Sequence, residues 1–173
     1  MSRFDSGFTL IELMIVLTII VILIFIGIPS YQSFITYNNI AAEANALTGD
    51  LQYARSNAIK NGLPVNVCTA NTNGGPPYAC SGSSTWSGGW VTYINNPPTN
   101  TVLRVQQPLT STDAMTSNSA TALSSVSFNY FGFSAIKGSI TVSPQSGSVS
   151  PKTVCISVVG NVQLVDGGDS LCP

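Results

Sequence analysis

The strongest constraint in this sequence is a nearly continuous apolar run over residues 8–28, in which Glu12 is the single ionisable side chain. About 20 helical residues span the roughly 30 Å hydrocarbon core of a bilayer. The run is longer than the core of a secretory signal peptide, and Pro29 and Ser30 follow it instead of a small-residue cleavage site. We therefore expect a transmembrane helix over residues 8–29.

Basic residues near this run indicate its orientation. Arg3 precedes the run, and the next basic residue is Arg55. The positive-inside rule therefore favours a cytoplasmic N-terminus, although Asp5 partly offsets Arg3. We expect a single-pass protein of the inner membrane whose remaining residues form a periplasmic head.

Glu12 is a candidate functional residue because a carboxylate inside a membrane helix is costly unless it is paired. It lies four residues after Phe8. If cleavage freed the amine of Phe8, an ammonium group would lie one helical turn away, or the same amine of a neighbouring subunit would pair with Glu12. The alternative is that Glu12 lies near the membrane interface and complements the helix dipole.

Residues 7–13, Gly-Phe-Thr-Leu-Ile-Glu-Leu, resemble the prepilin signal of type IV pilins and type II secretion pseudopilins. The resemblance implies that residues 1–7 are a leader peptide and that prepilin peptidase cleaves between Gly7 and Phe8. It also implies that Phe8 becomes N-methylated, that Glu12 sets the register of assembly and that Pro29 kinks the helix. Residues 8–29 would then form the filament core.

Beyond Pro29, apolar residues recur at steps of three and four, which predicts an amphipathic helix over residues 30–62. Asn61 and Gly62 form a helix-ending signal, and Pro64 follows. We expect the apolar stripe to pack on the head. Its members are Ile40, Ala44, Leu47, Leu51, Ala54 and Ala58.

The head, residues 63–173, changes to a period of two, which is typical of strands. Strands are predicted at residues 65–69, 90–94, 101–107, 126–131, 139–142 and 153–165, the last with a two-residue hairpin turn at Gly160 and Asn161. The predicted fold is α+β: a long N-terminal helix packed on a mainly antiparallel β-sheet head. Of Trp86 and Trp90 we expect one in the core, and we expect the aromatic cluster of residues 128–133 to pack in the core as well.

Four cysteines beside a membrane segment favour two disulfides in an oxidising compartment. Sequence alone allows three connectivities. We favour Cys68–Cys80 and Cys155–Cys172, because both pairings are local in sequence.

Two head segments narrow the resemblance further. Residues 87–93, Ser-Gly-Gly-Trp-Val-Thr-Tyr, and residues 155–160, Cys-Ile-Ser-Val-Val-Gly, resemble H-type pseudopilins and FimU- and FimT-type minor pilins. DNA-binding FimT-type members carry Gly-Arg-x-Arg, whereas this chain has Gly-Asn-Val-Gln at residues 160–163. Asn161 therefore argues against DNA uptake and favours a role in building a filament.

The composition disfavours an enzyme. The chain has no histidine, which removes the commonest general base and metal ligand. We expect no catalytic residues, no cofactor and no metal site. The cations of the head are scattered in sequence, which gives no reason to expect DNA binding. They are Arg55, Lys60, Arg104, Lys137 and Lys152.

The favoured function is a minor type IV pilin, a structural subunit that primes or joins pilus assembly in adhesion or twitching motility. The expected partners are other minor and major pilins or pseudopilins, prepilin peptidase and the inner-membrane assembly platform. After assembly the protein would lie in the pilus at the cell surface. The alternatives are an H-type pseudopilin of type II secretion and a DNA-binding minor pilin.

Overall fold

The computed structural model describes residues 9–70, 75–109, 113–117, 122–145, 149–168 and 172. The chain divides into two compact units, Met1–Ile35 and Thr36–Pro173, and each is described by itself. One continuous helix, α1 (Leu10–Asn61), contributes residues to both units.

The first unit consists, in its described part, of the N-terminal portion of α1. Every side chain over residues 10–28 is exposed. Among the described residues, α1 is the one helix that is long and apolar enough to cross a membrane. Gly7 and Phe8 lie outside the described residues, as does the side chain of Pro29, through which the helical backbone continues. The predicted kink at Pro29 therefore stays a prediction.

The second unit contains the rest of α1 and the β-rich head. The six apolar positions of the predicted stripe are all fully buried, which confirms the stripe. The helix ends at Asn61, as predicted, and Gly62 adopts the left-handed conformation (φ 65°) that is common after a helix C-terminus.

The described part of the head forms eight strands in two antiparallel sheets of four. One sheet has the order β3-β2-β1-β5 and the other the order β4-β6-β7-β8. The strands are β1 (Val65–Thr69), β2 (Trp90–Ile94), β3 (Thr101–Gln106), β4 (Ala114–Ser117), β5 (Ser125–Phe128), β6 (Gly138–Ser143), β7 (Lys152–Ile156) and β8 (Val162–Asp166).

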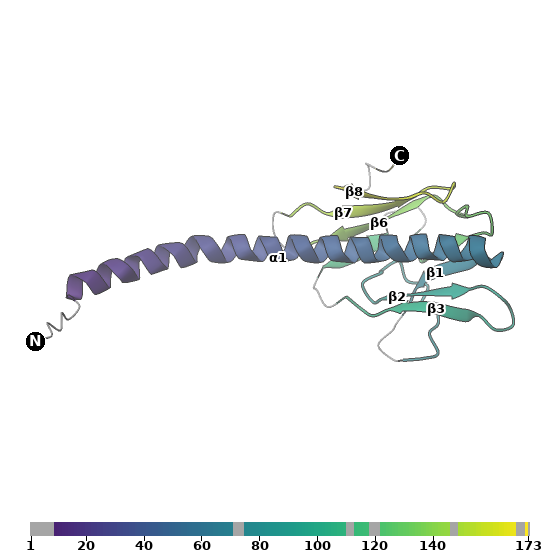
Figure 1. Cartoon of the computed structure of the whole chain (residues 1–173), viewed down its shortest axis with the longest axis horizontal. Coiled ribbons are helices and arrows are strands. Elements are labelled where there is room, and N and C mark those ends of the chain that lie inside the picture. Colours follow the sequence, from purple (N-terminus) through teal and green to yellow (C-terminus); the bar gives the residue numbers. More distant parts are fainter. Residues whose placement is uncertain are drawn as a thin grey trace, which may run out of the picture. The chain divides into compact units, whose positions relative to one another are not determined.

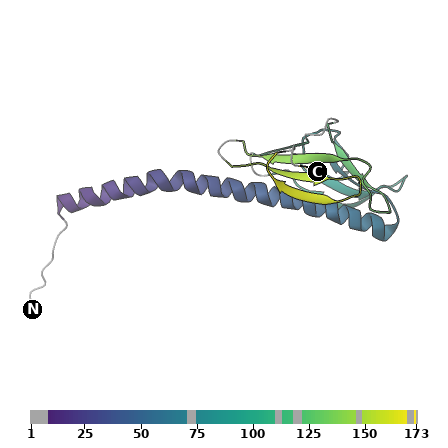
Figure 2. The ribbon, with the colours of Figure 1, turned by 90° about the horizontal axis from the view of Figure 1, so that it is seen from above.

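Both sheets cover the apolar stripe of α1. In Figure 1, β6, β7 and β8 are drawn on one side of the helix and β1, β2 and β3 on the other. Seen from above, the strands lie along one side of this part of the helix (Figure 2). One core cluster joins the stripe to buried residues of both sheets, including Val67, Phe128 and Ile140. The helix thus supplies the apolar partner that neither sheet provides alone.

Three strand predictions were wrong in detail. The segment β4 was not predicted, because its four residues are too short to establish a period. The strand expected over residues 126–131 ends at Phe128, where the chain turns and Gly132 donates its N–H to the carbonyl oxygen of Asn129 (2.8 Å). The β7–β8 hairpin has a five-residue loop, residues 157–161, instead of a two-residue turn, since Ile156 pairs with Val162.

The tryptophan prediction was also wrong, because both Trp86 and Trp90 are fully buried. Their rings lie 6.4 Å apart between centroids. A buried indole needs a partner for its N–H. Trp86 donates to the carbonyl oxygen of Leu123 (2.9 Å), and Trp90 donates to Asp50 (2.8 Å), so both rings are accommodated in the core.

Candidate functional site

The start of α1 carries a local hydrogen-bonding motif that includes Glu12. The hydroxyl oxygen of Thr9 accepts a hydrogen bond from the backbone N–H of Glu12 (3.3 Å), and the carbonyl oxygen of Thr9 accepts one from Leu13 (3.2 Å). Thr-x-x-Glu is the sequence of a capping box, a signal that the sequence reasoning missed. Glu12 is exposed, so its carboxylate is accessible for a contact outside the chain.

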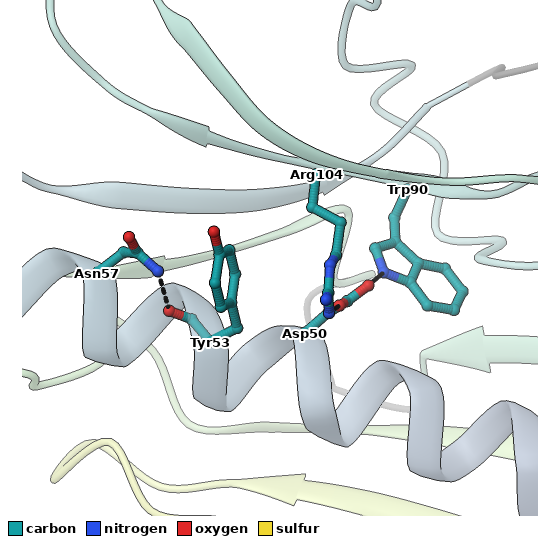
Figure 3. Close-up of polar contacts among 5 residues, drawn as sticks. All are labelled: Asp50, Tyr53, Asn57, Trp90 and Arg104. Carbon is teal, nitrogen blue, oxygen red and sulfur yellow. Dashed lines mark hydrogen bonds and ion pairs between the residues drawn. The ribbon is translucent and has the colours of Figure 1, made fainter.

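Helix α1 is fastened to the first sheet through the carboxylate of Asp50, which is buried although the sequence placed it off the apolar stripe. One oxygen accepts a hydrogen bond from the indole N–H of Trp90 on β2 (2.8 Å), and the other lies 2.5 Å from an Nη atom of Arg104 on β3 (Figure 3). A buried carboxylate is stable only when it is paired and hydrogen-bonded. Both conditions are met here by residues of the sheet.

Arg104, the partner of Asp50, also contacts an aromatic ring of α1. Its guanidinium lies over the ring of Tyr53 at 4.9 Å from the centroid, a cation–π contact. The hydrogen bond and the charge of Asp50 raise the pKa of Arg104 above its ordinary value. The side chain of Arg104 is about half exposed, so the buried end of the pair is Asp50.

The second sheet has its own ion pair, between the ammonium group of Lys152 on β7 and the carboxylate of Asp166 on β8. The pKa of Lys152 is raised, chiefly by its hydrogen bond to Asp166. The ammonium group also lies 5.1 Å from the ring centroid of Tyr37 on α1. Each sheet therefore has one cation that contacts both a carboxylate and an aromatic ring.

Arg55 connects α1 to two loops that are far apart in sequence. Its Nε–H donates to the carbonyl oxygen of Gly132 (3.0 Å), and an Nη–H donates to that of Val159 (3.3 Å). The loops also touch directly, since the N–H of Ser134 donates to the carbonyl oxygen of Val158 (3.0 Å). A Cβ atom at Gly160 would lie 1.8 Å from the carbonyl oxygen of Gly132, so this junction requires glycine.

The aromatic cluster lies largely on the surface, which corrects the prediction that it packs in the core. Phe128 is fully buried, but Tyr130, Phe131 and Phe133 are 52%, 66% and 49% exposed. The strand ends at Phe128, so strand alternation does not continue through these residues. Instead the turn projects them outward.

Both disulfides lie in the head. Cys68 on β1 is bonded to Cys80, with the Cα atoms 5.6 Å apart, and Cys155 on β7 is bonded to Cys172, with the Cα atoms 5.5 Å apart. The first bond closes the loop after β1, and the second attaches the C-terminal segment to the second sheet. Each closes a short loop, which is worth about 3 kcal/mol in the chain-entropy account.

The possible metal-ligating side chains of the described residues do not gather into a metal site. Among residues 9–70, 75–109, 113–117, 122–145, 149–168 and 172, no group of three His, Cys, Asp or Glu side chains is placed to hold a metal ion. The polar contacts described above join elements of the fold to one another.

The sequence matches two family models and is similar to two known fimbrial proteins. Residues 43–160 match the family described as "Type II transport protein GspH", and residues 2–28 match the "Prokaryotic N-terminal methylation motif". Two forms of "Type IV major fimbrial protein FimA" of Dichelobacter nodosus are 38% identical to this chain over 68 residues. Those 68 residues are 39% of this chain and only 43% and 42% of the relatives.

The fold is similar to that of a solved minor pilin. Two crystal forms of "type IV minor pilin FimU" of Pseudomonas aeruginosa superpose on the chain with TM-scores of 0.60 and 0.57 at 18% identity. The first superposition covers 79% of this chain and 93% of that chain, and the second covers 77% and 96%. The likeness establishes the pilin fold: one long helix packed on antiparallel sheets.

Proposed function

Since the chain belongs to the GspH family and begins with a methylation motif, we propose that it is a minor type IV pilin that joins or primes a pilus. In this proposal the protein is a structural subunit and has no catalytic activity. The observation that carries it is the apolar part of α1, whose side chains over residues 10–28 are all exposed in the single chain. Such a surface needs either lipid or other apolar helices around it.

Lipid would surround this helix before assembly, and the helices of other subunits would surround it afterwards. Before assembly, residues 8–29 anchor the protein in the inner membrane, with the N-terminus in the cytoplasm and the head in the periplasm. During assembly the helix leaves the lipid and packs among the helices of other pilins. Prepilin peptidase and the inner-membrane assembly platform act on the subunit at this membrane stage.

In our proposal, Glu12 sets the register in which the helix packs among the helices of other pilins. Its carboxylate is exposed, and in the sequence it follows by four residues Phe8, where cleavage would create an amine. A carboxylate surrounded by apolar helices favours the register in which an amine meets it. The capping contact with Thr9 holds the first turn of the helix in place for that pairing.

A pilus is favoured over a secretion filament by the relatives. The solved structures that share the fold are of a minor pilin, and the curated relatives are fimbrial proteins, whereas the family's printed description names type II transport. An H-type pseudopilin is therefore the second candidate. The two differ in which filament contains the subunit.

The experiment is to shear pili from cells that express the full chain and to measure the N-terminus and mass of the recovered subunit. We expect a mature protein that begins at Phe8, carries a methylated amine and is present in the pilus fraction. Cells that lack prepilin peptidase serve as the control and should retain a chain that begins at Met1. A processed subunit found in a type II secretion filament and missing from pili would replace this proposal by the second candidate.

A further inference from the structure

The loop patch is an exposed apolar surface next to the C-terminal end of α1. It comprises three side chains from residues 130–133, two from the β7–β8 loop and one from the helix. All are between 49% and 66% exposed: Tyr130, Phe131, Phe133, Val158, Val159 and Ile59. They adjoin because Ile59 approaches Gly132 and the two loops are hydrogen-bonded to each other.

The loop patch is held in shape before any partner arrives. The side-chain oxygen of Asn129 accepts hydrogen bonds from the backbone N–H groups of Phe131 and Phe133, both 3.0 Å long. Arg55 holds both loops on the helix. A surface that is ordered in advance loses little conformational entropy on binding, which favours affinity.

The chemistry of the patch fits a protein surface. Its rings are tilted, by 46° between Tyr130 and Phe131 and by 49° between Phe131 and Phe133, so they form a corrugated surface. Val158, Val159 and Ile59 add aliphatic area that a stacked base or sugar would not use. Aromatic and apolar residues at the centre with polar residues around them are typical of protein interfaces.

Among the residues that the structure describes, two exposed lysines lie at the ends of elements that border the loop patch. Lys60 follows Ile59 in the last turn of α1 and is exposed. Lys137 is exposed and precedes Gly138, which pairs with Ile156, the residue just before the β7–β8 loop. Residues 55–60, 129–134 and 157–161, which build the patch, contain no Asp or Glu.

The acidic residues of the second sheet lie at its other end. Asp166 pairs with Lys152, at the start of β7, and Asp113 precedes Ala114, which pairs with the last residue of β6. Arg104 and Lys152, the two cations that are neutralised by carboxylates, are not part of the patch. The tertiary structure thus places Arg55 against both loops, while Lys60 is next to Ile59 in sequence and Lys137 precedes the end of β6 that pairs beside the β7–β8 loop.

We propose that the loop patch is the docking surface for the head of another pilin-type subunit, one whose contacting face is apolar and rimmed by carboxylates. This inference rests on the proposed function in its choice of partner. Phe131 is the central anchor, because it is the most exposed of the three rings of the patch and contacts both others. Lys60 and Lys137 form the basic rim.

The test places the photocrosslinker p-benzoylphenylalanine at Phe131 of the full chain, in cells that assemble filaments. We expect an adduct with a different protein that has its own N-terminal methylation motif, joined through its head near Asp or Glu. The matched control places the crosslinker at Val102, an exposed apolar residue on β3, and should give about a tenth of the yield or less. A second probe at Phe133 should give the same partner.

The basic rim is tested in the same background. Lys137→Glu should lower the Phe131 adduct about fivefold or more, whereas Lys137→Arg should leave it unchanged. An adduct between two copies of this chain, a nuclease-sensitive adduct, or a yield insensitive to Lys137→Glu would overturn the inference. The amount of subunit in sheared filaments is recorded in parallel: its absence refutes the proposed function, while its presence without the adduct refutes only the docking surface.

Discussion

The indole N–H of Trp90 donates a 2.8 Å hydrogen bond to the carboxylate of Asp50, which joins α1 to β2 across 40 positions of sequence. The contact is fully enclosed, since Trp90 is 0% and Asp50 2% exposed. Arg104 binds the second oxygen from β3. The contact between α1 and the first sheet therefore includes a buried carboxylate that is bonded to two strands, in addition to its apolar packing.

The first prediction concerns this carboxylate. Asp50→Ala should lower the free energy of unfolding of the head by about 3 kcal/mol, because it leaves a buried indole N–H unpaired and removes the partner of Arg104. The measurement is urea unfolding of the detergent-solubilised full chain by tryptophan fluorescence. Both tryptophans lie in the head core, so the signal reports that unit.

Gln52→Ala is the matched control for that variant, because Gln52 is exposed on the same helix, and it should change the unfolding free energy by less than about 0.5 kcal/mol. Arg104→Met should lower the free energy of unfolding by an amount between those of Asp50→Ala and Gln52→Ala. In this variant Asp50 keeps its hydrogen bond to Trp90 but remains a buried charge without its ion-pair partner. Equal stabilities of Asp50→Ala and Gln52→Ala would show that the buried carboxylate contributes nothing to the fold.

The second prediction concerns the close approach of two loops at Gly160. Gly160→Ala should lower the unfolding free energy by about 3 kcal/mol or more, since the residue has φ 76° and its new Cβ would lie 1.8 Å from a backbone oxygen of Gly132. The change also separates the loops that Arg55 joins. The same urea titration measures the loss.

Gly82 provides a matched comparison, because it also has a positive φ of 71° but no atom lies within 4 Å of the position that an added Cβ would take. Gly82→Ala should therefore cost only the backbone strain, about 1 kcal/mol. If the two alanine variants were equally stable, the contact with Gly132 would not be the reason for glycine at position 160.

The third prediction concerns Glu12. Glu12→Gln keeps a side chain that suits the capping position and removes the charge. The variant should insert and be processed normally, because loss of a membrane charge eases insertion. It should enter sheared filaments about tenfold less than the wild type, since a charge-assisted contact of roughly 1–3 kcal/mol is lost.

Thr9→Val is the control for this variant, because it removes the hydroxyl that accepts the N–H of Glu12 and keeps the carboxylate. The loss of a cap costs about 1 kcal/mol and should reduce incorporation much less than Glu12→Gln. The measured quantity is the filament fraction of each variant divided by its membrane pool. A ratio near one for Glu12→Gln would assign Glu12 to capping or dipole stabilisation alone.

Local patterns predicted a large part of this fold. The stripe from Ile40 to Ala58 was placed by its period, and β1 and β2 were placed at their observed bounds. The helix end was placed by Gly62, whose positive φ is a property of glycine itself. These features depend on neighbouring residues, so a linear pattern contains the information.

The division of the strands into two sheets was not predictable in the same way. Each strand pattern shows that one face is buried but does not identify the pairing partner. The pairing of β1 with β5 and of β4 with β6 joins segments separated by other strands. Contacts of that range depend on how the complete core packs.

The sequence by itself determined the membrane-length helix, its methylation motif and the alternation of the head, because these are properties of adjacent residues. Only the tertiary structure decided that Asp50 is buried, since its partners Trp90 and Arg104 lie on other elements. It likewise decided that Phe131 is exposed and that Arg55 contacts the loops of Gly132 and Val159, because the end of β5 and the register of the strands set the positions of those loops. Burial and charge clustering are relations between distant segments, and they exist only once the chain has folded.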